Sequence, residues 1–188
     1  MYSDGEPAPE ADLLAALASV DPDASVPAGD VFTGEMSGIR FYTPYAYDAR
    51  KPCTYGPYGL WDGDGIIRPR DVRMLIEPSY LPEFYELVRT EARLCEDMEA
   101  MEALYQFPLS DNQYWIVRKT EPSWYSMYAR DWFTETEIAG RAAILIQSPE
   151  GLLPDRRPTL LVREDFGVTV IQGPDPDELI GIAEGLNR

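Results

Sequence analysis

The feature that most constrains the fold is an alternation of apolar and polar residues that begins near residue 112 and recurs almost to the C-terminus. A period of two places successive side chains on opposite faces of a strand, so the alternation predicts a sheet. The tight link at 164–167 favours antiparallel pairing, as in a meander. The predicted strands are 39–42, 113–119, 124–133, 141–147, 159–163 and 168–172.

Two segments instead show the spacing of amphipathic helices. Residues 79–106 carry apolar side chains at steps of three, four and seven, and no glycine or proline interrupts them after Pro82. Residues 175–187 begin with an aspartate that can cap a helix and a proline suited to its first turn. The pattern therefore predicts an α+β fold, in which a long helix and a C-terminal helix pack on an antiparallel sheet.

The N-terminal thirty residues differ from the rest of the chain. They contain seven acidic residues, no basic residue and four prolines, with one short apolar stripe at helical spacing. We expect an acidic tail with a short helix and a proline-rich loop over 1–30, followed by a single α+β domain over 31–188.

Composition excludes several classes of partner. The chain has 188 residues and a formal net charge of -17, which argues against direct nucleic-acid binding and against docking on anionic lipid. No apolar run is long enough to predict membrane insertion. The first residues lack the features of a signal peptide, so we expect a cytoplasmic protein, or an extracytoplasmic one if a leader precedes this sequence.

The absence of histidine removes the commonest general base and the commonest metal ligand. Phosphate-binding loops, dinucleotide fingerprints and nucleophile elbows are also missing. The Asp-Gly-Asp-Gly stretch at 62–65 does not continue as a calcium loop, because Ile67 and Arg73 occupy the places of its glycine and glutamate. We expect no catalytic residue, no metal and no cofactor, and therefore a protein that is not an enzyme.

Two cysteines, Cys53 and Cys95, lie in different segments. A disulfide between them is one alternative in an oxidising compartment. Because the sequence shows no leader, we expect free thiols.

A loop rich in aromatic residues and proline is the first candidate interaction surface. Tyrosine and tryptophan supply large contact areas at low entropic cost, so such clusters often mark recognition surfaces. The alternative is that these rings cover the sheet. The candidate residues are Tyr45, Tyr47, Tyr55, Tyr58 and Trp61.

Acidic residues along 83–102 form the second candidate surface. On a helix they would share one face, where Glu91, Glu99 and Glu102 would accelerate encounter with a partner that carries a basic patch. The alternatives are an ordinary solvated helix face and a row of carboxylates that imitates a DNA backbone.

The last fifty residues resemble a known group of domains. Residues 138–144, 159–163, 167–172 and 177–184 are similar to the closing hairpin and helix of bacterial extracytoplasmic domains of the LolA and MucB type. The resemblance implies a fold and carries over no functional residue.

The sequence as a whole favours a non-catalytic acidic protein that binds or inhibits a protein partner, of the immunity-protein or phage-accessory type. The first alternative is an extracytoplasmic carrier or sensor domain that holds an apolar ligand. The second alternative is a DNA-mimic inhibitor.

Overall fold

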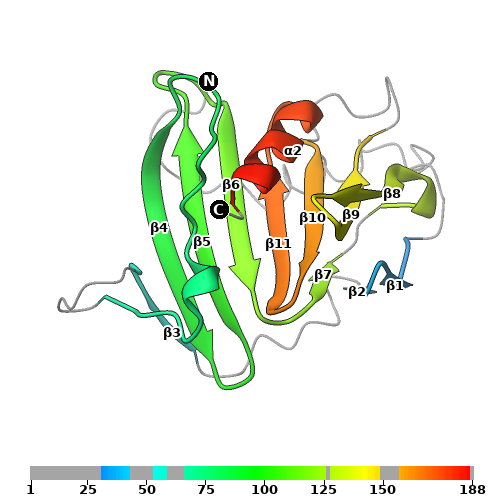
Figure 1. Cartoon of the computed structure of the whole chain (residues 1–188), viewed down its shortest axis with the longest axis horizontal. Coiled ribbons are helices and arrows are strands. Elements are labelled where there is room, and N and C mark those ends of the chain that lie inside the picture. The colour runs from blue at the N-terminus through cyan, green and yellow to red at the C-terminus, as the bar shows by residue number, and fades with distance from the viewer. Residues whose placement is uncertain (1–30, 43–52, 59–65, 126–127, 149–156, 187–188) are drawn as a thin grey trace, which may run out of the picture.

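The computed structural model describes residues 31–42, 53–58, 66–125, 128–148 and 157–186. In this part of the chain, eight antiparallel strands form one sheet in the order β3-β4-β5-β6-β11-β10-β9-β8 (Figure 1). Two meanders thus meet where β6 pairs with β11. The strands are β3 (Cys53–Gly56), β4 (Glu86–Cys95), β5 (Glu99–Gln106), β6 (Gln113–Lys119), β8 (Phe133–Ile138), β9 (Arg141–Ile146), β10 (Thr159–Glu164) and β11 (Gly167–Gln172).

A smaller sheet of three strands covers part of one face of the large sheet. It has the order β1-β2-β7, in which β1 (Gly34–Met36) and β2 (Ile39–Tyr42) are antiparallel and β7 (Ser123–Tyr125) is parallel to β2. Ile39 and Phe41 are buried in the same cluster as Ile144 and Val170 of the large sheet.

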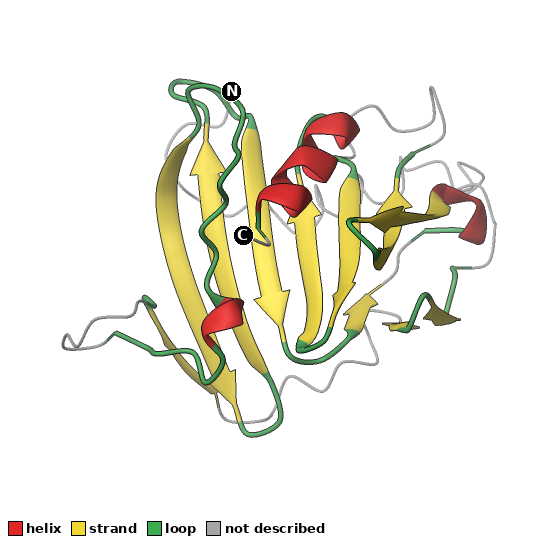
Figure 2. Cartoon of the chain, in the orientation of Figure 1, coloured by secondary structure: helices red, strands yellow, loops and turns green. Residues whose placement is uncertain are grey.

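The opposite face is covered by α2 (Pro176–Gly185), which lies over β10 and β11 (Figure 2). The Asp175 side chain accepts a hydrogen bond of 2.9 Å from the backbone N–H of Asp177, and Pro176 occupies the first turn. Leu179, Ile182 and Ala183 are buried against the sheet. The predicted C-terminal helix is confirmed, although it is shorter than the predicted range.

The prediction of a long helix over 79–106 is wrong. The structure forms the hairpin of β4 and β5 there, and Cys95 N–H donates to the Met98 carbonyl at 2.8 Å across the turn. Ala92 pairs with Met101, and both are buried on the face that α2 covers. In the described residues the chain is thus mostly antiparallel sheet with one α-helix.

Most predicted strands agree with the structure to within one residue at each end. The exception is the predicted strand 124–133, which is wrong in its extent. In the structure β7 ends at Tyr125, and a 3-10 helix at Arg130–Trp132 leads into β8. The N-terminal tail over 1–30 lies outside the described residues.

The prediction of free thiols is wrong. Cys53 of β3 and Cys95 of β4 face each other in the antiparallel ladder and form a disulfide. The bond joins the edge strand β3 to the rest of the sheet. Sequence spacing could not show this pairing, because it depends on the turn that reverses the chain between β4 and β5.

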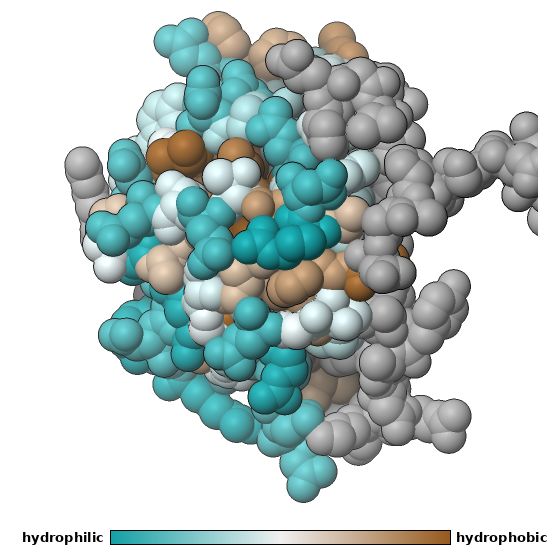
Figure 3. Space-filling model, turned by 90° about the vertical axis from the view of Figure 1, so that its right-hand side faces the viewer, coloured by the Kyte–Doolittle hydropathy of each residue, from teal (hydrophilic) through white to brown (hydrophobic). Residues whose placement is uncertain are grey.

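The strand at the other edge of the sheet, β8, carries polar and charged side chains. Residues 134–137 of β8, with the sequence Thr-Glu-Thr-Glu, are all exposed. Figure 3 looks toward this side of the molecule, where hydrophilic residues predominate around a smaller apolar area. Charged side chains on an edge strand disfavour pairing with another chain.

Candidate functional site

Among the described residues, five of the nine large apolar or aromatic side chains that are exposed gather at the end of the sheet where β4 begins and β5 ends (upper left in Figure 1). We call this group the apolar tip. Its members and their exposed fractions are Phe84 70%, Leu87 54%, Val88 57%, Phe107 37% and Leu109 107%. Exposed apolar side chains are ordinary when scattered, but a contiguous group indicates an interaction surface.

Each loop of the tip is built on a β-turn with an unusual third residue. In the turn 82–85, Tyr85 N–H donates to the Pro82 carbonyl at 3.5 Å, and Phe84 has a φ of 69°. In the turn 107–110, Ser110 N–H donates to the Phe107 carbonyl at 3.3 Å, and Leu109 has a φ of 60°. A β-turn whose third residue has a positive φ favours glycine or asparagine at that third position. Both turns therefore hold a bulky apolar residue where local conformation disfavours one.

Aromatic contacts support the tip from below. The ring of Tyr85 lies 4.7 Å from the ring of buried Tyr114 and 5.7 Å from the ring of Phe107, measured between centroids. Phe107 in turn meets Phe84 edge to face at 6.2 Å. These contacts connect the two turns to each other and to the core.

A β-bulge adds the aliphatic part of the tip. The register between β4 and β5 shifts between Leu87 and Arg89. Residues 86–89 are all exposed as a result, and two consecutive apolar residues, Leu87 and Val88, face solvent. A regular strand would have directed one of the two toward the core.

The charged residues around the tip are mainly acidic. Glu83, Glu86 and Asp111 are exposed beside it. Two arginines are nearby: Arg89 lies 3.9 Å from a carboxylate oxygen of Glu91, and Arg157 keeps its charge while it donates to the backbone carbonyl of Asp111 at 2.6 Å. The acidic residues outnumber these arginines, so the rim presents net negative charge, in keeping with the whole chain.

The aromatic candidates from the sequence fall into three groups. Tyr45, Tyr47 and Trp61 lie outside the described residues. Tyr55 is exposed on β3, where the Arg93 guanidinium lies 5.9 Å from its ring centroid. Tyr58 is half-buried against the core on the helix side, and burial raises the pKa of its hydroxyl.

The three candidate glutamates do not share a face. Glu99 is buried, and one of its carboxylate oxygens accepts the Arg70 N–H at 2.8 Å. Glu102 points from the opposite face and accepts the Trp115 indole N–H at 3.2 Å, and burial raises the pKa of its carboxyl. Glu91 pairs across the ladder with Glu102 on that same face. The expected row of carboxylates depended on the helix that the structure does not form.

Sequence reasoning missed the apolar tip. The signal was present in two short stretches, Pro82-Glu83-Phe84 and Phe107-Pro108-Leu109, where a proline precedes a bulky residue by one or two positions. Assigning the first stretch to a helix placed Phe84 in the core.

Comparisons with family models, curated proteins and solved structures find no match to this chain. Among the described residues, no group of side chains has the composition of a metal site. No helix in the described part is long and apolar enough to cross a membrane.

Proposed function

We propose that this chain is a non-catalytic domain that binds a protein partner through the apolar tip. The observation that carries the proposal is the pair of turns that hold Phe84 and Leu109 in left-handed conformations with their side chains in solvent. Bulky residues adopt this conformation at a cost of about 1 kcal/mol or more each. A cost of this kind persists where the residue serves a function, and aromatic side chains such as that of Phe84 are enriched in protein interfaces.

The partner suited to this surface is a protein with an apolar cleft bordered by basic residues. The rim of the tip is acidic, and the chain carries a net charge of -17. An anionic membrane would repel such a chain, and so would a second copy of it. A basic rim would attract it and would align the apolar surfaces during encounter.

The disulfide supports an oxidising location for this binding domain. Disulfides persist in extracytoplasmic compartments and are rare where glutathione and thioredoxin keep thiols reduced. The pairing of Cys53 with Cys95 therefore favours the extracytoplasmic alternative over the cytoplasmic expectation. The resemblance of the last fifty residues to domains of the LolA and MucB type favours the same location.

Site-specific photo-crosslinking tests the proposal. Chains that carry p-benzoylphenylalanine at position 84, 109 or 31 are incubated with extract from cells of the source organism and irradiated. Val31 is the control position, because it is an exposed valine (42%) that pairs with Ala129, away from the hairpin of β4 and β5. We expect one discrete protein adduct from positions 84 and 109 and none from position 31. Excess wild-type chain should suppress the adduct, and excess Phe84→Ser/Leu109→Asn chain should not.

Three other outcomes would overturn the proposal. Adducts of twice the chain mass would show self-association, adducts with lipid would show a membrane surface, and equal labelling at all three positions would show that the tip has no special role.

A further inference from the structure

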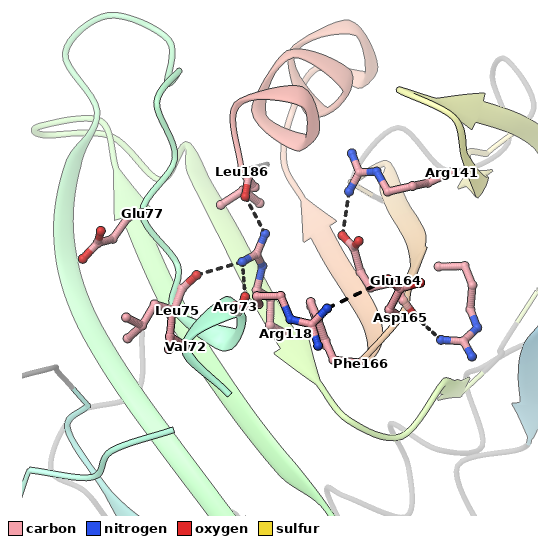
Figure 4. A pocket seen from close by; sticks show the side chains of 11 residues that line it. Val72, Arg73, Leu75, Glu77, Arg118, Arg141, Glu164, Asp165, Phe166 and Leu186 are labelled. Atoms are coloured by element: carbon pink, nitrogen blue, oxygen red, sulfur yellow. Dashed lines mark hydrogen bonds and ion pairs between the residues drawn. The ribbon is translucent and has the colours of Figure 1, made fainter. Parts of the chain in front are cut away.

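A pocket of about 570 Å³ opens on the helix-covered face, between the end of α2, the segment 72–77 and the hairpin of β10 and β11 (Figure 4). We call it the arginine pocket, because Arg73, Arg118, Arg141 and Arg163 contribute to its lining. Its volume is within the range of small-molecule sites. Four arginines around one pocket are notable in a chain with 33 acidic and 16 basic residues.

Arg118 is the most buried of the four, with 4% of its surface exposed. It projects from β6 and donates hydrogen bonds to the carbonyls of Arg73, Leu75 (2.9 Å) and Leu186 (2.8 Å). These bonds use three of the five N–H donors of a guanidinium. Its Nε is buried and has no hydrogen-bond partner among the described residues.

Three carboxylates also belong to the lining, those of Glu77, Glu164 and Asp165, and none of them forms an ion pair with Arg118 in the described part of the chain. Glu164 is held by Arg141 at 2.7 Å and by the Thr169 hydroxyl at 3.0 Å, and its charge only partly offsets the lowering of the Arg118 pKa by burial. Asp165 lies 3.9 Å from Arg73, which forms a closer ion pair with Asp71 at 2.6 Å. Among the described residues, Arg118 itself has only neutral carbonyls within hydrogen-bond distance. Burying a charge without a directly paired counter-ion is unfavourable, and an anion in the pocket would offset part of that cost.

The apolar part of the lining lies beside Arg118. The ring of Phe166 lies 5.6 Å from the guanidinium carbon of Arg118 and 5.9 Å from that of Arg73. Leu75 and Leu186 complete the wall beside Arg118. Figure 4 shows the guanidinium of Arg118 beside Leu75 and Leu186, with the pair of Arg141 and Glu164 on the opposite side.

We infer that the arginine pocket binds a small organic carboxylate with a short apolar body. The carboxylate would lie beside the Arg118 guanidinium and accept a hydrogen bond from the Nη2 N–H that Leu186 does not use, since Nε is closed off from solvent. The body would lie against Phe166 and Leu75. Arginine suits this role because its planar fork matches a carboxylate. The site is distinct from the apolar tip, so the inference does not depend on the proposed partner.

Titration of the ¹⁵N-labelled full chain with chosen probes tests this inference. Benzoate and hexanoate are the carboxylate probes, benzamide and hexanamide are their neutral counterparts, and inorganic phosphate is the anion without an apolar body. We expect saturable shifts of the amide signals around Phe166 and Leu75 with both carboxylates. Binding of the two amides and of phosphate should be weaker by about tenfold or more, because each lacks one of the two features that the pocket recognises.

Two variants connect the binding to the pocket. Leu75→Trp fills it without removing a charge and should weaken benzoate binding by about tenfold or more. Arg118→Gln removes the charge and should do the same if the variant folds. Val88→Ser, at the apolar tip, is the control and should bind benzoate as the wild type does.

Equal affinity for benzoate and benzamide would overturn the role of the charge. Equal affinity for phosphate and benzoate would overturn the role of the apolar wall. Shifts that persist in Leu75→Trp, or no saturable binding of either carboxylate, would overturn the site.

Discussion

At the scale of single residues, the apolar tip contains two bulky residues whose backbone conformations are unfavourable for them. Phe84 and Leu109 both take positive φ values, although their side chains have too few contacts to compensate by burial. Leu109 is the clearer case because its side chain is fully exposed. Stability and function therefore make opposite demands at this position.

Replacing Leu109 by asparagine should consequently stabilise the fold. Asparagine tolerates the left-handed conformation, and the exposed leucine contributes no burial that could be lost. We expect the free energy of unfolding to rise by up to about 1 kcal/mol, measured by urea denaturation. A decrease of 1 kcal/mol or more would indicate that the leucine packs against the protein and is not a free anchor.

Lys119 is a second residue whose setting has a measurable consequence. Its ammonium group is buried, donates to the Ser123 hydroxyl at 3.3 Å and lies 5.4 Å from the centroid of the Trp124 ring. Burial lowers the pKa of this lysine to about 8. The unfolded chain keeps its lysine protonated up to about pH 10.4. Above pH 8 the unfolded state therefore binds more protons than the native state, and stability rises with pH.

Between pH 7.5 and 9 we expect the free energy of unfolding to increase by about 1 kcal/mol. Lys119→Met should remove this increase. The window ends at pH 9, because burial raises the pKa of native tyrosines, to about 12 in Tyr105, and the tyrosines of the unfolded chain then ionise first and oppose the increase. Urea denaturation of both chains across the window measures the slope, and a flat profile in the wild type would contradict it.

At the scale of secondary-structure elements, the sequence predicted the second half of the chain better than the first. Strands β6, β10 and β11 are short segments rich in apolar, β-branched and aromatic residues, which favour a strand, and α2 carries both a cap and a first-turn proline. The hairpin of β4 and β5 is different. Its alanines, leucines and glutamates favour a helix, and no glycine or proline marks its turn at 96–98.

Pairing with neighbours decides the structure of that segment. β5 lies between β4 and β6, and its inward residues Met101 and Ala103 meet a core formed by α2 and the segment that contains Met74. A single-sequence pattern cannot represent contacts with strands that follow later in the chain. The same limitation concealed the apolar tip, which exists only because the hairpin brings Phe84 and Phe107 together.

The disulfide that joins the edge strand β3 to β4 should make a measurable contribution to stability. It closes a loop with a sequence separation of 42 residues, for which the entropic model predicts a contribution of about 4 kcal/mol. The Cys53→Ala/Cys95→Ala chain should lose stability on that scale in urea denaturation. Intact mass under denaturing, non-reducing conditions should be two daltons below that of the reduced chain. Two titratable thiols in the native protein would contradict the pairing.

At the scale of the whole molecule, the net charge of -17 affects the rate at which the chain associates with its partner. Long-range attraction to a basic partner accelerates association, whereas the apolar contact sets the lifetime of the complex. We therefore expect added salt to slow association severalfold and to change dissociation little. Surface-based kinetics from 50 to 500 mM salt measure both rates. Salt that mainly accelerated dissociation would place the charges inside the interface, contrary to a rim.

The affinity of tip variants for the partner isolated by crosslinking tests the central claim most directly. Phe84→Ser/Leu109→Asn is compared with the Val31→Ser control by biolayer interferometry, after urea denaturation has shown that both chains are folded. We predict that the double substitution raises Kd by at least about 30-fold, equivalent to about 2 kcal/mol, mainly through faster dissociation. The control should remain within about twofold of the wild type. A folded double variant that binds with wild-type affinity would contradict the account.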